Sequence, residues 1–196
     1  MSASCVERER GRPVVGDDAL PLDRWANFYL VTSAAAATLV GLLFVVITLA
    51  AERARAQETS KIGLYLTPTV VFFGSVLCLA AMLTFPTQSP LSAAVCCGLT
   101  GTAGIAYALS TLLVSRRGQT RFYERRDVIQ YVVLPAAAYG LLIGGGAMLM
   151  HTPQRGLTLV AVGMLALIAL GLRNSWSIAV QIVSWRHSEK DAGDNT

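Results

Sequence analysis

Residues 157–178 read LTLVAVGMLALIALGLRNSWSI, an apolar run in which Arg173 is the one charged side chain. A helix that crosses a hydrocarbon core of about 30 Å needs about 20 apolar residues. The run has that length, and it contains no acidic residue. It therefore predicts a transmembrane helix, and it makes lipid the solvent for this part of the chain.

Four further stretches upstream have the same character. They lie, with no acidic side chain in any of them, at 28–51, 64–85, 91–114 and 131–150. Charged residues make up 14% of the chain, whereas soluble domains carry about 25%. We therefore expect an all-α integral membrane bundle of five transmembrane helices over residues 27–186, between a mobile tail at 1–26 and a C-terminal tail at 187–196.

The connections between these stretches differ in length and charge. Two are short and contain proline, at 86–90 and 151–156, and two are longer and basic, at 52–63 and 115–130. Five spans would put ten Lys and Arg residues on the side of the long connections and five on the side of the N-terminal tail. Because the cytoplasmic side carries the excess of basic residues, we expect the N-terminus outside and the C-terminus inside, in the inner membrane of a bacterium.

Small residues at helical spacing mark candidate contacts between helices. They let backbones approach closely in lipid, where no hydrophobic force drives helix association. Two interpretations remain open, namely packing inside one bundle and a seam between copies in a homo-oligomer. We expect Leu142 to face lipid, and we predict helix contacts at Gly98, Gly101, Gly140 and Gly144. The first span carries a similar stripe at Ala34, Ala37, Thr38 and Gly41.

Arg173 and Asn174 form a candidate polar site in the last span. Charged residues inside a membrane usually mark function. Arg173 lies 16 residues beyond Leu157, which is about 24 Å along a helix. In one interpretation its long side chain reaches the cytoplasmic head groups, and Trp176 lies in the same interfacial belt. In the other, Arg173 and Asn174 face inward and bind an anion or neighbouring carbonyls.

The connection between the third and fourth spans is rich in arginine. A basic residue beside anionic lipid contributes about 1 kcal/mol, so we expect contact with anionic head groups rather than with nucleic acid. Docking of a cytoplasmic partner is the alternative. The residues concerned are Arg116, Arg117, Arg121, Arg125 and Arg126.

Motifs for catalysis or metal binding do not occur in the chain. It contains no HExxH, no nucleophile elbow and no paired carboxylates. The four cysteines lack the spacing of a zinc site, and His151 and His187 are isolated. We therefore expect no catalytic residue, metal or cofactor.

Two phrases carry a resemblance. Phe28-Tyr29 with ATLVGLLFV at 37–45, and LRNSW at 172–176, resemble a group of small uncharacterised bacterial multi-span membrane proteins. That group has no assigned activity, so the resemblance implies only a multi-span membrane protein.

The sequence thus favours a non-enzymatic membrane protein that acts as a structural or interaction module, with a homo-oligomer as one form of it. The alternative is a small channel or facilitator assembled from several copies. A permeation path would align polar faces across several spans. The candidate polar residues are scattered, at Thr67, Thr100, Thr102, Ser110 and Asn174.

Overall fold

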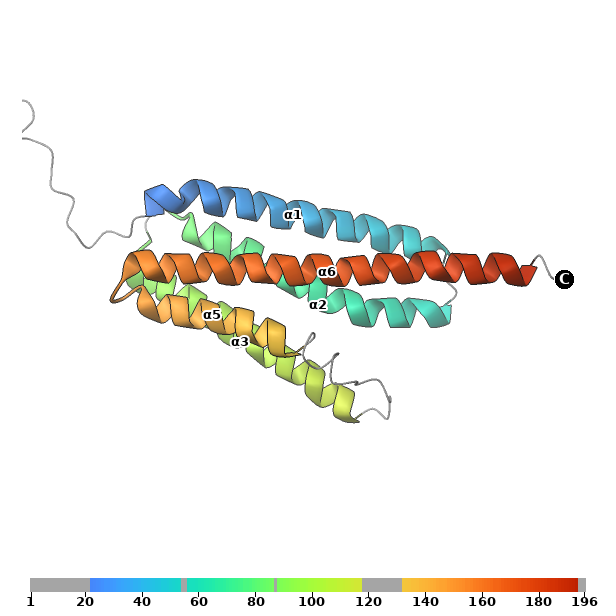
Figure 1. Cartoon of the computed structure of the whole chain (residues 1–196). Helices are drawn as coiled ribbons and strands as arrows, with labels where there is room; N and C mark the ends of the chain where they lie inside the picture. The colour runs from blue at the N-terminus through green and yellow to red at the C-terminus, as the bar shows by residue number, and fades with distance from the viewer. Residues whose placement is uncertain (1–21, 54–55, 87, 118–131, 194–196) are drawn as a thin grey trace, which may run out of the picture.

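The computed structural model describes residues 22–53, 56–86, 88–117 and 132–193, and every regular element in this part of the chain is helical. Successive helices run in opposite directions along the bundle (Figure 1). They are α1 (Leu22–Arg53), α2 (Ala56–Leu83), α3 (Pro90–Arg117), α5 (Leu134–Met148) and α6 (Pro153–Gly193). The all-α class predicted from the apolar runs is confirmed for the described residues.

Three of the helices contain a stretch that is long and apolar enough to cross a membrane, namely Arg24–Thr48, Pro90–Thr111 and Pro153–Ser177. Two apolar stretches are shorter, Pro68–Leu83 and Leu134–Met148. The 15 residues of α5 rise about 22 Å, which is less than the roughly 30 Å of a hydrocarbon core. Membrane insertion is therefore supported by three helices, and α5 is shorter than the predicted span at 131–150.

Helix boundaries differ from the predicted ones where the sequence turns polar. α1 begins at Leu22, inside the predicted tail, and α2 begins at Ala56, inside the predicted connection at 52–63. α6 continues to Gly193, through most of the predicted C-terminal tail. These segments are rich in Ala, Glu, Gln, Lys and Arg, which have high helix propensity. The apolar runs mark the membrane-compatible part of each helix and not its ends.

Local hydrogen bonds stabilise the short turn before α3. At the start of α3, the Ser92 backbone N–H donates to Ser89 Oγ (3.1 Å), and the Ser89 N–H donates to Ser92 Oγ (3.0 Å). This reciprocal pair resembles a capping box, and Pro90 occupies the first helical position, where a missing N–H costs nothing. Pro135 likewise lies in the first turn of α5, where a proline costs little.

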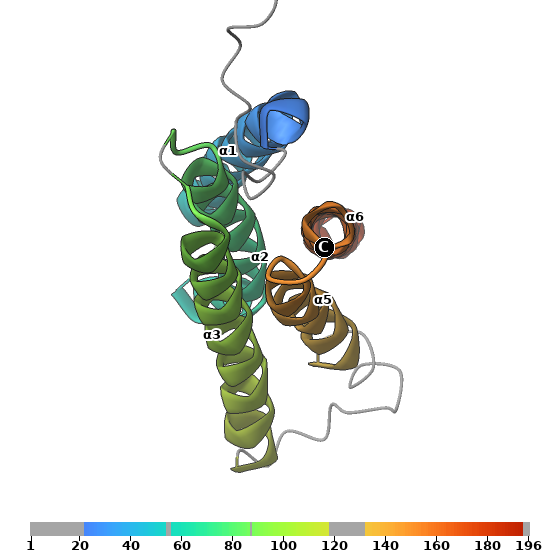
Figure 2. The same ribbon diagram turned by 90° about the vertical axis from the view of Figure 1, so that its left-hand side faces the viewer.

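The helices differ in how closely they pack against their neighbours. α5 packs against α3 and α6, while α2 packs against α1 and α6. Viewed down the bundle, α1 lies at its edge, away from α5 (Figure 2). The buried face of α1 consists of Tyr29, Thr32, Ala36 and Leu43, and only 17% of its apolar stretch is buried. The core therefore centres on α2, α5 and α6.

Candidate functional site

Glycines allow the backbones of α5 and α6 to lie in direct contact. A Cβ added at Gly145 would lie 2.9 Å from the Val160 backbone nitrogen, and one at Gly156 would lie 2.8 Å from that of Leu149. A Cβ at Gly163 would lie 3.1 Å from the Ala138 carbonyl oxygen. Any side chain at these positions would push the two helices apart, because backbone atoms cannot move aside as a flexible side chain can. The close packing of α5 against α6 therefore requires glycine at these three positions.

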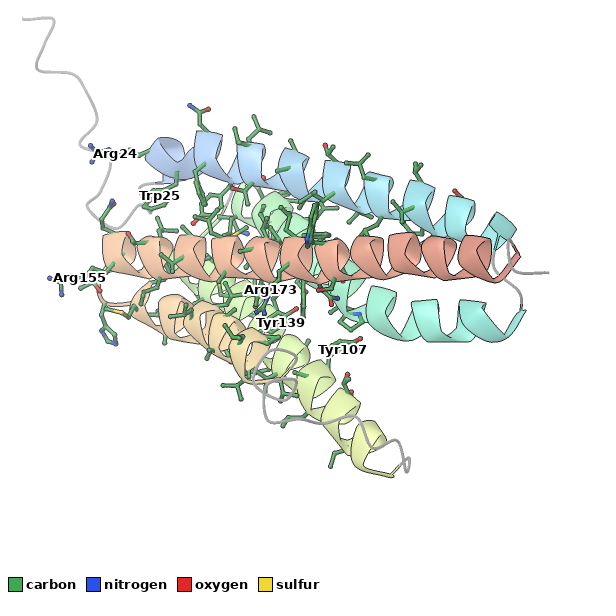
Figure 3. The ribbon with its side chains drawn as sticks, turned by 45° about the vertical axis from the view of Figure 1, so that its right-hand side comes forward. Arg24, Trp25, Tyr107, Tyr139, Arg155 and Arg173 are labelled. Carbon is green, nitrogen blue, oxygen red and sulfur yellow. The ribbon has the colours of Figure 1, made fainter. Side chains whose placement is uncertain are left out.

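Glycines also allow close contact between α3 and α5, around Tyr139. A Cβ at Gly101 would lie 2.9 Å from the Tyr139 carbonyl oxygen, and Gly104 lies directly against the Tyr139 ring. The ring is fully buried, and its hydroxyl shares a 3.0 Å hydrogen bond with Ser75 Oγ of α2. Figure 3 shows Tyr139 in the interior of the bundle. One aromatic side chain thus links α2, α3 and α5.

Gly140 and Gly144 lie on the opposite face of α5. Both are exposed, and a Cβ added at either would meet nothing within 4 Å. Among the described residues, no part of the same chain therefore packs against these two glycines, as the first interpretation requires. Gly145 and Gly146 make the contacts instead, and Leu142, expected to face lipid, is fully buried. The second interpretation of Gly140 and Gly144, a seam between copies, stays a prediction.

The two predicted contact glycines of α3 also differ from each other. Gly101 is buried against Tyr139 and Ile143, whereas a Cβ at Gly98 would meet nothing within 4 Å. The contact face of α3 continues through Gly104 in one direction and Cys97 in the other. Gly98 and Gly101 are three residues apart and could share one face of α3. Only Gly101, however, lies against Tyr139.

Arg173 and Asn174 point to different environments. Asn174 is buried, and its Nδ2 donates a hydrogen bond to Thr69 Oγ1 of α2. Arg173 is exposed, on the flank of α6 next to α5 (Figure 3). Adjacent residues of a helix are about 100° apart, so fixing Asn174 inward turns Arg173 outward. The structure does not bring the two side chains into one anion site.

The arginine-rich connection is only partly described. Arg116 and Arg117 are the last two residues of α3. The other three predicted contact residues, Arg121, Arg125 and Arg126, lie outside the described residues.

Several residues that matter in the structure were missed by the sequence reasoning. Gly156 and Gly163 contact α5 from α6, and their spacing of seven residues is the signal that could have found them. Tyr29 is fully buried, whereas the neighbouring Trp25 and Phe28 are only partly buried. The Tyr29 hydroxyl has no hydrogen-bond partner among the described residues. No sequence pattern separates Tyr29 from these two aromatic neighbours.

The exposed face of α5 around Gly140 and Gly144 is lined by small residues. Among the described residues, no group of three or more His, Cys, Asp or Glu side chains is placed to hold a metal ion. The surface of α5 around Gly140 and Gly144 offers close backbone approach and no reactive group. The candidate site is therefore this outer face of α5, which we call the Gly140–Gly144 face and which includes the exposed Ala137 and Ala147.

Searches of family models, curated proteins and solved structures found no match to this chain. The resemblance carried by residues 28–45 and 172–176 therefore remains a prediction.

Proposed function

We propose that the protein is a non-enzymatic integral membrane module that associates with copies of itself through the Gly140–Gly144 face of α5. The single observation that carries the proposal is the exposure of two glycines, four residues apart, with open space where each Cβ would lie. Small residues at this spacing are typical of close helix contacts in membranes. The intrachain contacts of α5 do not use this face.

The flanking residues enlarge the same face. Ala137 and Ala147 are exposed one turn before Gly140 and about one turn after Gly144. The four positions form a shallow, small-residue surface about 10 residues long, or roughly 15 Å along the helix. A second α5 could approach this surface closely, and van der Waals packing would then replace loose contact with lipid tails.

We further propose that all five apolar helices insert, with the N-terminus outside and the C-terminus inside. The basis is the excess of Lys and Arg on the side of the long connections. Alkaline phosphatase and a fluorescent protein, fused separately at the C-terminus, report the side on which it lies. Fluorescence without phosphatase activity is the expected result, and the reverse pattern would overturn this threading.

The association is tested by the mass of the purified protein in nanodiscs. Gly140→Leu would add a bulky side chain to the proposed contact, so the variant should be monomeric where the parent is oligomeric. Ala81→Leu is the matched control, because Ala81 is also a small, exposed helix residue and lies outside the small-residue stripes of α1 and α5. A monomeric parent, or equal masses for the parent and Gly140→Leu, would contradict the proposal.

The alternative, a channel or facilitator built from several copies, has weaker support. Exposed hydroxyls of Thr38, Thr102 and Ser110 each donate a hydrogen bond to a carbonyl of their own helix, at 2.8 Å. Such internal bonds let a polar side chain face lipid without a water-filled path. A liposome flux assay on the oligomer separates the two functions, since the proposed module should conduct no small solute.

A further inference from the structure

Arg173 has a fixed direction because two contacts fix the rotation of α6 around it. Asn174 donates to Thr69 on one side, and a Cβ added at Gly171 would lie 2.5 Å from the Phe73 ring. Both contacts turn the residues flanking Arg173 toward α2. Arg173 is therefore turned away from α2, to the flank of α6 next to α5, where it is exposed (Figure 3).

The surface around Arg173 on α6 is mostly apolar, with the exposed Ser177 one turn further along. Val162, Ala169 and Trp176 are exposed at spacings of seven residues or less along the same side of α6. Val162 is 48% exposed and Trp176 is 73% exposed. A face of this composition is suited to lipid, and Arg173 lies at its edge, on the flank of α6 next to α5 (Figure 3).

The depth of Arg173 follows from the register of the α5–α6 hairpin. Gly163 lies beside Ala138, and Gly156 lies beside Leu149. Continued along both helices, this register places Leu134, the first residue of α5, level with Ala169. Arg173 then lies about one turn, or roughly 6 Å, beyond the start of α5.

The other end of α6 gives an independent measure of depth. Arg173 lies 20 residues beyond Pro153, the first residue of α6, which corresponds to about 30 Å. That distance equals the thickness of a typical hydrocarbon core. With Pro153 at the opposite boundary, the guanidinium would lie between acyl chains and head groups, on the side where α3 ends at Arg117.

A cation at this boundary pairs with an anion, and the helices that the structure describes supply no acidic side chain at this level. The segments at the level of Arg173, residues 66–73 of α2, 108–115 of α3 and 169–177 of α6, contain no Asp or Glu. A guanidinium pairs with phosphate through two parallel hydrogen bonds. Trp176, about one turn nearer the C-terminus, adds an indole ring and an N–H donor of the kind found at membrane interfaces.

From these observations we propose that Arg173 and Trp176 form a binding site for the phosphate of an anionic phospholipid in the leaflet facing the C-terminus. Arg173 holds the phosphate, Trp176 packs beside the glycerol region, and Asn174 acts as a positioning residue through its bond to Thr69. The site rests on the membrane insertion proposed above and not on self-association.

Native mass spectrometry of the full-length protein, released from detergent and titrated with phosphatidylglycerol, tests the site. The parent should bind its first phosphatidylglycerol more tightly than phosphatidylcholine. Arg173→Gln should weaken this first binding about fivefold, the factor expected for one arginine at an anionic surface. Arg173→Lys should weaken it less, because lysine keeps the charge but loses the planar bidentate contact.

Control experiments distinguish the phosphate of a lipid from free inorganic phosphate. They also distinguish loss of the site from loss of folding. Arg155→Gln, an exposed arginine at the other end of the bundle (Figure 3), should leave the first phosphatidylglycerol affinity unchanged. Equal affinity for the parent and Arg173→Gln would overturn the proposal, and so would displacement of the lipid by inorganic phosphate. Gly140→Leu should retain the lipid site, so a failure of the oligomer and a failure of this site give different results.

Discussion

The α5–α6 hairpin and the edge helix α1 show two ways to hold a helix in a bundle. The hairpin packs backbone on backbone through Gly145, Gly156 and Gly163. α1 instead contacts its neighbours through large side chains, chiefly Tyr29 and Leu43, and leaves most of its surface exposed. In lipid, apolar side chains gain little by leaving the solvent, so close approach decides stability. The hairpin should therefore be the rigid part of the molecule.

The largest loss is expected in the hairpin itself. Gly145→Ala and Gly156→Ala each place a methyl group within 3 Å of backbone atoms of the partner helix. Overpacking of this kind costs about 1–3 kcal/mol, and we expect the upper end because backbone must shift. Thermal unfolding in detergent measures it, with Gly74→Ala, where a Cβ meets nothing within 4 Å, as the control that should match the parent. Parent-like stability of Gly156→Ala would show that the helices can separate without cost.

A smaller loss is expected at the α1–α2 contact. Leu43 is 6% exposed and packs with Phe73. Leu→Ala costs about 2–5 kcal/mol in soluble cores, but part of that cost is transfer to water, which is absent where lipid fills the gap. Leu43→Ala should therefore lose less stability than Gly156→Ala in the same assay. The opposite order would mean that α1 is held as tightly as the hairpin.

The two fully buried tyrosines should respond in opposite directions to loss of the hydroxyl. Tyr139 is hydrogen-bonded to Ser75, whereas the Tyr29 hydroxyl has no partner among the described residues. Tyr139→Phe should cost about 0.6 kcal/mol, the average for interhelical hydrogen bonds in membranes. Tyr29→Phe should leave stability equal or raise it, because a buried hydroxyl without a partner is unfavourable. A larger loss for Tyr29→Phe than for Tyr139→Phe would contradict this assignment.

The smallest effect on folding is expected at Arg173. Its side chain is exposed and makes no contact that fixes the helices, unlike Asn174. Arg173→Lys should match the parent in membrane yield and melting temperature, since both side chains can reach the head groups. A marked loss of stability with lysine would indicate a specific buried partner for the guanidinium.

The sequence predicted the helices well, because runs of apolar residues in lipid have few alternatives to a helix. It did not predict which face of α5 turns inward. Glycines occur on both faces of that helix, at 140 and 144 and at 145 and 146, and each pair is compatible with a close contact. The choice is made by partners far away in the chain, Val160 for Gly145 and Cys97 for Gly146.

The candidate polar site shows the same limit. Arg173 and Asn174 are adjacent in the sequence and were considered together, yet one is exposed and the other buried. Their separation depends on Thr69, 105 positions from Asn174. Helical periodicity places adjacent residues on different sides, but only the partner shows which side is inside.

Cysteine cross-linking in native membranes tests the central claim, self-association through the Gly140–Gly144 face. In a cysteine-free background, Gly140→Cys and Gly144→Cys would each place a thiol at the proposed contact, while Ala81→Cys places one on the exposed face of α2. Mild oxidation should give a covalent dimer with Gly140→Cys or Gly144→Cys and none with Ala81→Cys. Absence of a dimer at both α5 positions, or equal yield at Ala81, would contradict self-association through this face.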